Sequence, residues 1–568
     1  MRKTWLFVFV LSGIFTVSQT VLAEGPIVWV VPSSLVRIAP TETAGVETTA
    51  AISAARGEYQ SFQVAIQAPV GGLTELNFSV SNLVRVESNA GENEDRGSGD
   101  QVILQENVAL YREKYMTVRQ HSPTYNGPPN LPITNIDTFP DALIPFIDPA
   151  TGVPPVGGTY VAAPINLAAG HNAVFWADVL IPHNAKAGRY KGIYTVTSKQ
   201  GSVQGQIHLT VWNFTLPLKP SLKSLIGGGD SNLSAGGALA AGIEAELLSN
   251  RLMPDTSGTA LASESTDISQ YGLNDFDLGY YENVSYSNCN GKYLTPAPPT
   301  LAVLQSAVNA QPTGLYLNDY TADPESSCTN TAFYDSVIAW AQVLHQVTVP
   351  GQVGVDNLVS QQPVPQLYDD GLGTGRSAVD IWTMLPQNYN DAEAEVPPAV
   401  TFVLKKGDKA WSYNDLVQDS YSPKWELDFL PIDYRIQAGF ISQSLGLTGL
   451  NYWAVTEWTS PSTAWTNPQG YADYPGEGIL VYPGGPAGLE RTTSYEGVAP
   501  SMRLKDLRDG VQDYEYIQIL KDCGHGEWAL ERSRDVGRDW TNWTRDSMLL
   551  ESVRRELGNK IAALGCSR

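Results

Sequence analysis

The chain of 568 residues is poor in positive charge and in histidine. It carries 36 Lys and Arg against 59 Asp and Glu, a formal net charge of −23, so a nucleic-acid backbone would be repelled over most of its surface. Its six His form no His-Glu-x-x-His pair, and the sequence contains neither a Gly-x-Ser-x-Gly elbow nor a phosphate-binding glycine loop. The sequence therefore predicts no nucleic-acid partner, no metal and no cofactor, and it disfavours a serine hydrolase.

Long apolar runs are scarce as well, and the clearest one lies at the N-terminus. The basic start Met1–Lys3 leads into the apolar run Trp5–Leu11, and small residues lie before Ala23. This pattern predicts a signal peptide over residues 1–23, cleaved after Ala23. An uncleaved anchor is the alternative, but the run is short for a membrane span. We expect a secreted or periplasmic protein that has no membrane span after cleavage.

Cysteine is also rare, with four residues and no close Cys-x-x-Cys spacing of the kind that binds zinc. In an oxidising compartment the pairings Cys289–Cys328 and Cys523–Cys566 are favoured, because each closes a loop of moderate length. Four buried free thiols are the alternative.

The first part of the mature chain, residues 24–217, reads as short strands separated by Gly, Pro and Asn, and it predicts a β-sandwich. The stretch 120–158, rich in Pro, Asn, Thr and Gly, is expected to be a loop or flap, and the stiff connector Pro217–Pro220 marks a domain boundary. The predicted strands are Val28–Val31, Phe62–Ile66, Phe175–Pro182, Tyr190–Val196 and Gln206–Trp212.

Residues 218–500 alternate between helical stretches and short apolar runs, which predicts a parallel sheet and favours a (β/α)₈ barrel of the TIM type. A doubly wound open sheet remains the alternative, because fewer than eight strands are clear. The predicted helices are Ala238–Leu252, Thr300–Ala310, Phe333–Gln346 and Ile432–Leu445. The predicted strands are Leu222–Ile226, Leu315–Leu317, Gly351–Val355, Val379–Trp382, Lys409–Tyr413 and Gly449–Trp453. Residues 501–568 are expected to form C-terminal helices, about 501–522 and 544–564, packed on the barrel.

Polar residues at the ends of predicted barrel strands are the candidates for chemistry. The run Gly314–Tyr320 breaks from apolar residues into Asn318 and Asp319, and carboxyl ends of strands form the active-site mouth of such barrels. Asn and Asp also end strands as ordinary turn formers, which is the alternative for this pair. Further carboxylates near strand ends are Asp356, Asp380, Asp415 and Glu457; we take Asp319, Asn318, Asp415 and Glu457 as the catalytic candidates.

Aromatic residues gather near the same strand ends, and the chain contains 14 Trp and 27 Tyr. Sugar rings stack on aromatic faces, and an acid beside them can protonate a glycosidic oxygen, so the combination predicts a glycosidase acting on an oligosaccharide or glycoconjugate. Core filling is the alternative for each ring, and it is favoured for Trp411 and Tyr452. The candidate sugar-binding residues are Tyr316, Tyr320, Trp382, Tyr413, Trp453 and Trp458.

Five blocks of sequence together resemble glycoside hydrolase family 123, whose C-terminal region is also known as domain of unknown function 4091. The C-terminal blocks are Gly449–Trp453, Gly476–Gly484 and Ser501–Tyr516, and the N-terminal ones are Arg56–Val64 and Pro182–Gly192. The resemblance spans nearly the whole mature chain. It implies a β-sandwich followed by a (β/α)₈ barrel that acts as a retaining exo-β-N-acetylgalactosaminidase, in which the substrate's acetamido group attacks the anomeric carbon.

The resemblance also implies an adjacent Asp-Glu pair, and here the sequence departs from the family. Tyr316-Leu317-Asn318-Asp319-Tyr320 stands where the family has Tyr-x-x-Asp-Glu-Pro. In one register Asn318 replaces the polarising Asp and Asp319 the acid; in the other Asp319 is the polariser and Tyr320 replaces the acid. Three outcomes follow: a glycosidase using Asp319 with Asp415 or Glu457, an acetamidosugar hydrolase that tolerates Asn318, or a catalytically inactive carbohydrate-binding protein.

Overall fold

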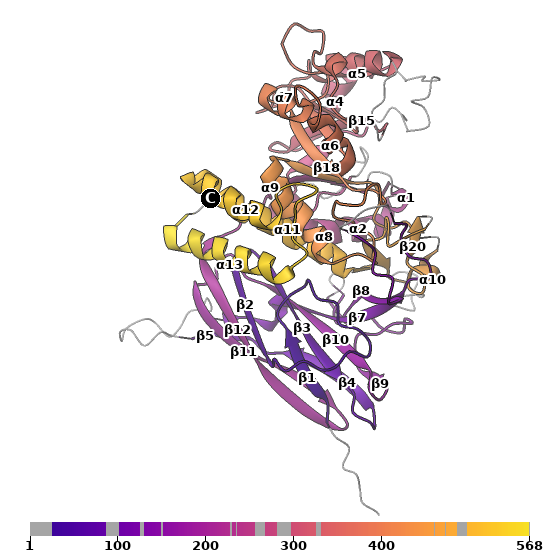
Figure 1. Ribbon diagram of the computed structural model, residues 1–568, viewed down its shortest axis with the longest axis vertical. Coiled ribbons are helices and arrows are strands. Elements are labelled where there is room, and N and C mark those ends of the chain that lie inside the picture. The colour runs from indigo at the N-terminus through magenta and orange to yellow at the C-terminus, as the bar shows by residue number, and fades with distance from the viewer. Residues whose placement is uncertain are drawn as a thin grey trace, which may run out of the picture.

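The protein is elongated, with its N-terminal sheets at one end and its α/β part at the other in the computed structural model (Figure 1). The C-terminal helices lie between these two parts (Figure 1). The structure describes residues 25–86, 102–124, 130–148, 152–227, 230–234, 236–255, 267–280, 297–324, 331–458, 460–471, 473–485 and 497–566. The predicted signal peptide and the Cys289–Cys328 pairing lie outside these residues. Within them, no helix has the length and apolarity needed to cross a membrane.

The N-terminal part consists of two sheets. The described strands of the first run antiparallel in the order β1 (Ile27–Val31), β3 (Tyr59–Gln67), β10 (Asn172–Leu180), β7 (Val108–Thr117), β8 (Thr138–Pro145). The strands of the second sheet lie in the order β2 (Thr49–Arg56), β12 (Gly201–Thr215), β11 (Gly188–Ser198), β4 (Leu73–Val80), β9 (Ile165–Leu167). In addition, β5 (Leu83–Arg85) pairs with β11, and β6 (Val102–Ile103) pairs with β5.

The two sheets share one apolar cluster of buried side chains. Phe78 of β4 stacks on Phe175 of β10 with ring centroids 5.1 Å apart, so side chains of the two sheets pack against each other there. All five predicted strands overlap strands of these sheets. The prediction that residues 120–158 form only a loop is wrong, because β8 lies within them; its two prolines, Pro140 and Pro145, hid an edge strand from the sequence pattern.

The α/β part is built on one parallel sheet. Its described strands lie in the order β13 (Lys223–Ile226), β19 (Gly449–Tyr452), β18 (Lys409–Tyr413), β17 (Ile381–Met384), β16 (Asp356–Val359), β15 (Tyr316–Ala322), β14 (Asp275–Asp277). Helical segments between them are α1 (Ser231–Ser234), α2 (Gly237–Ser249), η3 (Asp267–Tyr271), α4 (Leu301–Ala310), α5 (Thr331–Leu344), η5 (Pro365–Leu367), α6 (Pro386–Glu393), α7 (Ala399–Lys406), and the run α8 (Ile432–Ile436), η6 (Gln437–Ile441), α9 (Ser442–Leu445).

The parallel sheet is nearly closed, and a short segment lies beside its first strand. Ile226 of β13 donates its amide to the Met253 carbonyl at 3.0 Å, and Asp255 donates to the Ile226 carbonyl at 2.8 Å. Inside the sheet Trp411 fills the space that Gly449 leaves open, since a Cβ on Gly449 would lie 2.3 Å from the indole. This ring of strands is therefore a packed core, as in barrel enzymes.

One predicted strand of this sheet is wrong, and one observed strand was not predicted. The prediction of a strand at Gly351–Val355 is wrong: Gly351 and Gly354 have φ of +83° and +71°, and the strand starts at Asp356. Strand β14 was missed because its three residues carry only one apolar side chain, Phe276.

After β19 the chain forms α10 (Pro461–Ala464), β20 (Gln469–Tyr471), β21 (Tyr474–Pro475), β22 (Val481–Pro483) and β23 (Val498–Pro500), and then α11 (Met502–Leu520), η7 (Lys521–His525), α12 (Gly526–Val536) and α13 (Ser547–Leu564). Ser501 caps α11 by accepting the Leu504 amide. The predicted disulfide Cys523–Cys566 is confirmed, and it joins η7 to the end of α13.

Helix α11 is buried on all sides although it is rich in charge. Every residue of it except Gln518 is buried. Its basic residues reach acids of the N-terminal sheet: Arg503 pairs with Asp141 of β8 at 2.9 Å, and Arg508 pairs with Asp178 of β10 at 2.6 Å. The helix thus contacts both halves of the molecule instead of covering only the barrel exterior.

Candidate active site

The predicted site residues of strand β15 lie on two different faces of the parallel sheet, some on its inner face and some on its outer face. Tyr316 and Tyr320 pack with Leu225, Leu358, Ile381 and Trp411, which form the interior cluster of the ring of strands. Leu317 packs instead with residues of α4 and α5. Because side chains alternate along a strand, Asn318 lies on the inner face and Asp319 on the outer face.

Asp319 is completely buried beside a second acid. Its Oδ1 accepts the Tyr280 amide at 2.9 Å, and Asp277 at the end of β14 accepts the Tyr320 amide at 2.7 Å. Burial raises the pKa of Asp277 well above its usual range, and the charges of Asp255 and Asp319 raise it further. Burial beside another acid therefore favours the protonated form of Asp277.

Asn318 is completely buried, and neither atom of its amide group has a hydrogen-bond partner in the described part of the chain. In register it lies between Asp277 of β14 and Asp356 of β16. Such a buried amide with free donor and acceptor capacity is a group that a polar ligand could satisfy. Tyr320, two residues on, is partly exposed on the same inner face.

The strand continues past the Asn-Asp pair to Ala322, so the first carboxylate beyond its end is Asp323. The Ser360 hydroxyl, just past the end of β16, donates to Asp323 Oδ1. The sequence analysis missed Asp323 because it ended the strand at Leu317, five residues too early.

Other predicted site residues lie at or beyond the carboxyl ends of the neighbouring strands. Tyr413 is the last residue of β18 and Asp415 follows it; Trp453, Glu457 and Trp458 follow β19. Tyr413 and Asp415 are almost fully buried, whereas Trp453, Glu457 and Trp458 are partly exposed. The Trp458 indole donates to the Val481 carbonyl at 3.0 Å. Burial and the nearby Asp230 raise the pKa of Glu457. Trp453, Glu457 and Trp458 thus present two aromatic side chains and one acidic side chain to solvent on this side of the sheet.

Two buried glutamates were missed because they lie in loops without strand or helix periodicity. Glu426 lies between β18 and α8, and Glu477 lies between β21 and β22. Burial raises the pKa of each to about 8, and the charge of Glu426 contributes to the shift at Glu477. Glu477 accepts the indole N–H of Trp453 at 2.7 Å.

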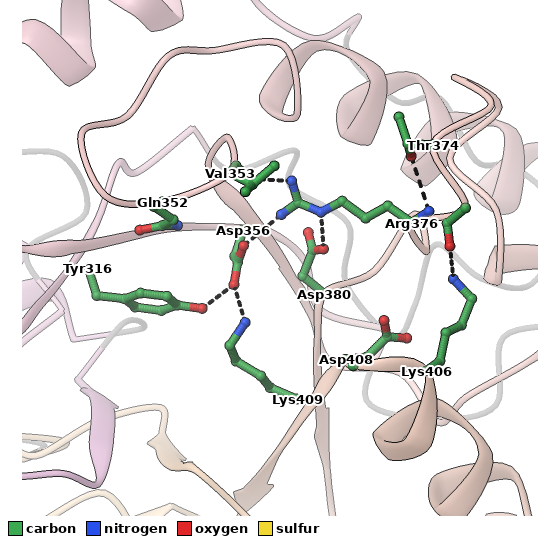
Figure 2. A pocket seen from close by; sticks show the side chains of 12 residues that line it. Tyr316, Gln352, Val353, Asp356, Thr374, Arg376, Asp380, Lys406, Asp408 and Lys409 are labelled. Atoms are coloured by element: carbon green, nitrogen blue, oxygen red, sulfur yellow. Dashed lines mark hydrogen bonds and ion pairs between the residues drawn. The ribbon is translucent and has the colours of Figure 1, made fainter.

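Tyr316 lies at the opposite end of β15 from Ala322, in a pocket of about 410 Å³ at the amino ends of the strands (Figure 2). Its hydroxyl donates to Asp356, the first residue of β16. Arg376 binds Asp356 and Asp380 at 2.6 Å each, and Lys409 binds Asp356 at 2.8 Å (Figure 2). These paired charges close the amino end of the sheet, away from Asp319.

Trp382 is also remote from the carboxyl-end groups. It has no exposed surface, its indole donates to Asp408 Oδ2 at 3.1 Å, and Tyr368 meets its ring edge-on. It packs among residues of α5, α6 and α7, in the layer between the sheet and its helices. This position is one of core packing.

No protein-family model matches the sequence, and no curated protein matches it. A family 123 glycoside hydrolase from Clostridium perfringens, whose structure was analysed for glycolipid glycan hydrolysis, superposes with a TM-score of 0.63 at 13% sequence identity. The match covers 95% of this chain and 98% of that one. The chain therefore has the fold of a family 123 glycoside hydrolase.

Two other solved structures match much less well. A putative alpha-galactosidase from Bacteroides fragilis is 12% identical over 50% of this chain and 56% of that one, with a TM-score of 0.21. A PapD-like domain of human CEP192 is 10% identical over 37% of this chain and 96% of that one, with a TM-score of 0.14. Neither carries an argument about this protein.

Proposed function

We propose that this protein is a glycoside hydrolase of the family 123 type that acts on N-acetylgalactosaminide-like glycans, with Asn318-Asp319 in place of the Asp-Glu pair. The observation that supports it most is the shared fold over 95% of the chain. The Asn-Asp pair lies on β15, completely buried and next to Asp277, a carboxyl group whose pKa burial raises well above its usual range. A carboxyl group with a raised pKa, beside a group able to bind an acetamido side chain, suits a general acid in this chemistry.

In this proposal the two residues have different roles. Asn318 binds the acetamido group through its amide on the inner face, which has no hydrogen-bond partner among the described residues. A neutral amide stabilises a positively charged intermediate less than a carboxylate would. Asp319, together with Asp277, supplies the acid. Asp415 and Glu457 are the further candidates for a base or nucleophile.

The test is turnover on a panel of aryl glycosides that includes the N-acetylgalactosaminide. We expect Asp319→Asn to lose about 10²–10⁴-fold in kcat on any glycoside that the wild type cleaves. We expect Asn318→Asp to hydrolyse the N-acetylgalactosaminide faster than the wild type. Asp535→Asn, at an exposed carboxylate of α12, is the matched control and should behave as the wild type. Wild-type turnover in Asp319→Asn would remove this residue from the mechanism.

The alternative is a catalytically inactive carbohydrate-binding protein on the same scaffold. It is supported by the complete burial of Asp319, whose Oδ1 already accepts the Tyr280 amide. A glycan array read together with reducing-sugar release separates the two proposals. Binding to a glycan without release of any sugar supports the binding protein, and release supports the enzyme.

We also propose that the protein is secreted or periplasmic, after cleavage behind Ala23. The disulfide Cys523–Cys566 supports this location, because such bonds persist in oxidising compartments. The test is mass spectrometry of the protein recovered outside the cytoplasm. Its mass should be that of a chain beginning at Glu24, and 2 Da less than that of the reduced chain for each disulfide formed.

For the architecture, we propose that Met253–Asp255 is the eighth strand of a (β/α)₈ barrel and that the N-terminal sheets form a β-sandwich. The hydrogen bonds of Met253 and Asp255 to Ile226 support the first, and the Phe78–Phe175 stacking supports the second. A crystal structure would test both proposals. The eighth strand requires a hydrogen-bond ladder from Met253–Asp255 to β13 and to β14, and the β-sandwich requires the two N-terminal sheets to pack face to face.

A further inference from the structure

A lysine, an asparagine and a glutamate meet in the interior, where the end of helix α2 contacts the start of helix α11. Glu246 lies in the last turn of α2, and Asn250 caps the end of this helix. Lys505 lies in the first turn of α11. Glu246, Asn250 and Lys505 are 6%, 1% and 4% exposed, so the three polar groups meet away from solvent.

Each of these three groups contacts the other two. The Lys505 ammonium group lies 3.2 Å from Glu246 Oε1 and donates to Asn250 Oδ1 at 3.1 Å. The side-chain nitrogen of Asn250, Nδ2, donates to the same Glu246 Oε1 at 2.8 Å. An ion pair between a lysine and a glutamate needs no asparagine. An amine, a carboxamide and a carboxylate in mutual contact supply the nucleophile, the acyl group and the proton carrier of an amide exchange.

The side chain of Asn250 is held in place by its own helix. Its Nδ2 also donates to the main-chain carbonyl of Glu246 at 2.7 Å, and its backbone amide donates to the Leu247 carbonyl at 3.0 Å. Because a C=O bond is about 1.23 Å long, the contact of Lys505 Nζ with Oδ1 places Nζ at most about 4.3 Å from Asn250 Cγ. This distance is about 1 Å longer than in a near-attack arrangement, so a small movement of the lysine side chain brings the two atoms together.

The other charged and aromatic groups near Lys505 come from the first N-terminal sheet and from α11. Asp178 of β10 lies 3.7 Å from the Lys505 ammonium group, but Arg508 of α11 already binds this carboxylate at 2.6 Å. The ring centroid of Tyr111 on β7 lies 5.4 Å from the same ammonium group. Burial of an ammonium group with a carboxylate costs free energy, and transfer of one proton from Lys505 to Glu246 removes both charges. The neutral amine that results is a nucleophile.

We propose that Lys505 and Asn250 become joined by an amide bond that the protein forms itself, with Glu246 as the proton carrier. Glu246 takes a proton from the Lys505 ammonium group, and the neutral amine attacks Cγ of Asn250. As the Nζ–Cγ bond forms, Glu246 passes this proton to Nδ2, and the Cγ–Nδ2 bond breaks to release ammonia. Nζ gives up a second proton, which leaves with the ammonia as an ammonium ion. Glu246 ends as a carboxylate, no electrons are exchanged with another molecule, and no other reactant is needed.

The bond ties the end of α2 to the start of α11. These two residues are 255 positions apart in the sequence, so the bond closes a very long loop that stays closed when the chain unfolds. This inference is independent of the proposed function, because no step of the reaction uses a glycan.

The first test is mass spectrometry of the full wild-type protein after reduction and denaturation. Its mass should be lower than the mass calculated from its residues by one ammonia, about 17 Da. Trypsin should release one branched peptide, in which Ser224–Arg251 is joined to Leu504–Arg508 and the chain is not cleaved after Lys505. A wild type with the calculated mass overturns the proposal. Loss of ammonia with the two peptides separate also overturns it, because an asparagine has then cyclised onto its own backbone.

The second test uses three variants. Glu246→Gln lacks the carboxylate and Lys505→Arg lacks the amine, so both should have their calculated masses and separate peptides. Glu244→Gln, on the same helix, is the matched control and should contain the branched peptide as the wild type does. Far-UV circular dichroism shows whether each variant is folded. A folded Glu246→Gln that still contains the branched peptide overturns the role of Glu246, and if this variant does not fold, the branched peptide of the wild type decides the bond.

Discussion

Asp141 of β8 pairs with Arg503, which holds two loops together, one between β18 and α8 and one between β21 and β22. Replacing Asp141 should therefore destabilise the protein strongly. Arg503 and Asp141 are both completely buried and form two hydrogen bonds, of 2.9 and 3.0 Å. The same guanidinium donates to the carbonyls of Trp425, Gly476 and Ile479. Asp141→Asn therefore removes the charge that balances an arginine that cannot leave the interior.

Loss of one partner from a buried ion pair costs about 3–5 kcal/mol, because the other charge stays buried and uncompensated. The amide keeps one acceptor for Arg503, so we expect about 3 kcal/mol for Asp141→Asn, measured as the free energy of unfolding from urea titration. The matched control is Glu75→Gln, which breaks the pair with Lys199 at 2.5 Å; both side chains are more than half exposed, at 59% and 62%. This control should cost less than about 1 kcal/mol. Equal losses in the two variants would refute the reasoning.

Two further predictions concern stability. Replacing both Cys523 and Cys566 by Ser should cost about 4 kcal/mol in the free energy of unfolding, because the bond closes a loop with a sequence separation of 43; a loss below 1 kcal/mol in urea titration would contradict this. Burial raises the pKa of Asp275 to about 7, so its contribution is complete below about pH 4 and is lost as the pH rises through 7. Asp275→Asn should therefore flatten the decline in stability between about pH 4 and 7, and an unchanged decline would exclude Asp275 as its source.

Much of the element order could be predicted because periodicity and caps are local properties. Helix α11 begins after Ser501, whose hydroxyl accepts the Leu504 amide, and its apolar stripe was visible in the sequence. The apolar stripe did not predict that the charged residues between its members are buried as well. The partners of Arg503 and Arg508 lie more than 300 positions away, and such distant pairs leave no local pattern.

Residues of the candidate site could be predicted only where they lie at or near a strand that the sequence pattern reveals. The Asn318-Asp319 pair ends an apolar run, and both residues are indeed buried on β15. Asp356 was placed at the wrong end of its strand, because Gly354 and the residues before it form a turn where a strand was expected. Glu477 could not be found from sequence, since its loop is fixed by tertiary contacts.

The burial of α11 between the two halves constrains the order of events during synthesis. Glu58, Asp141 and Asp178 lie on or beside strands made early, but their partners Arg554, Arg503 and Arg508 are made last. The N-terminal sheets leave the ribosome with these acids unmatched and cannot reach their final packing until the last 70 or so residues emerge. A nascent chain stalled before α11 should consequently remain open to proteases and dependent on chaperones.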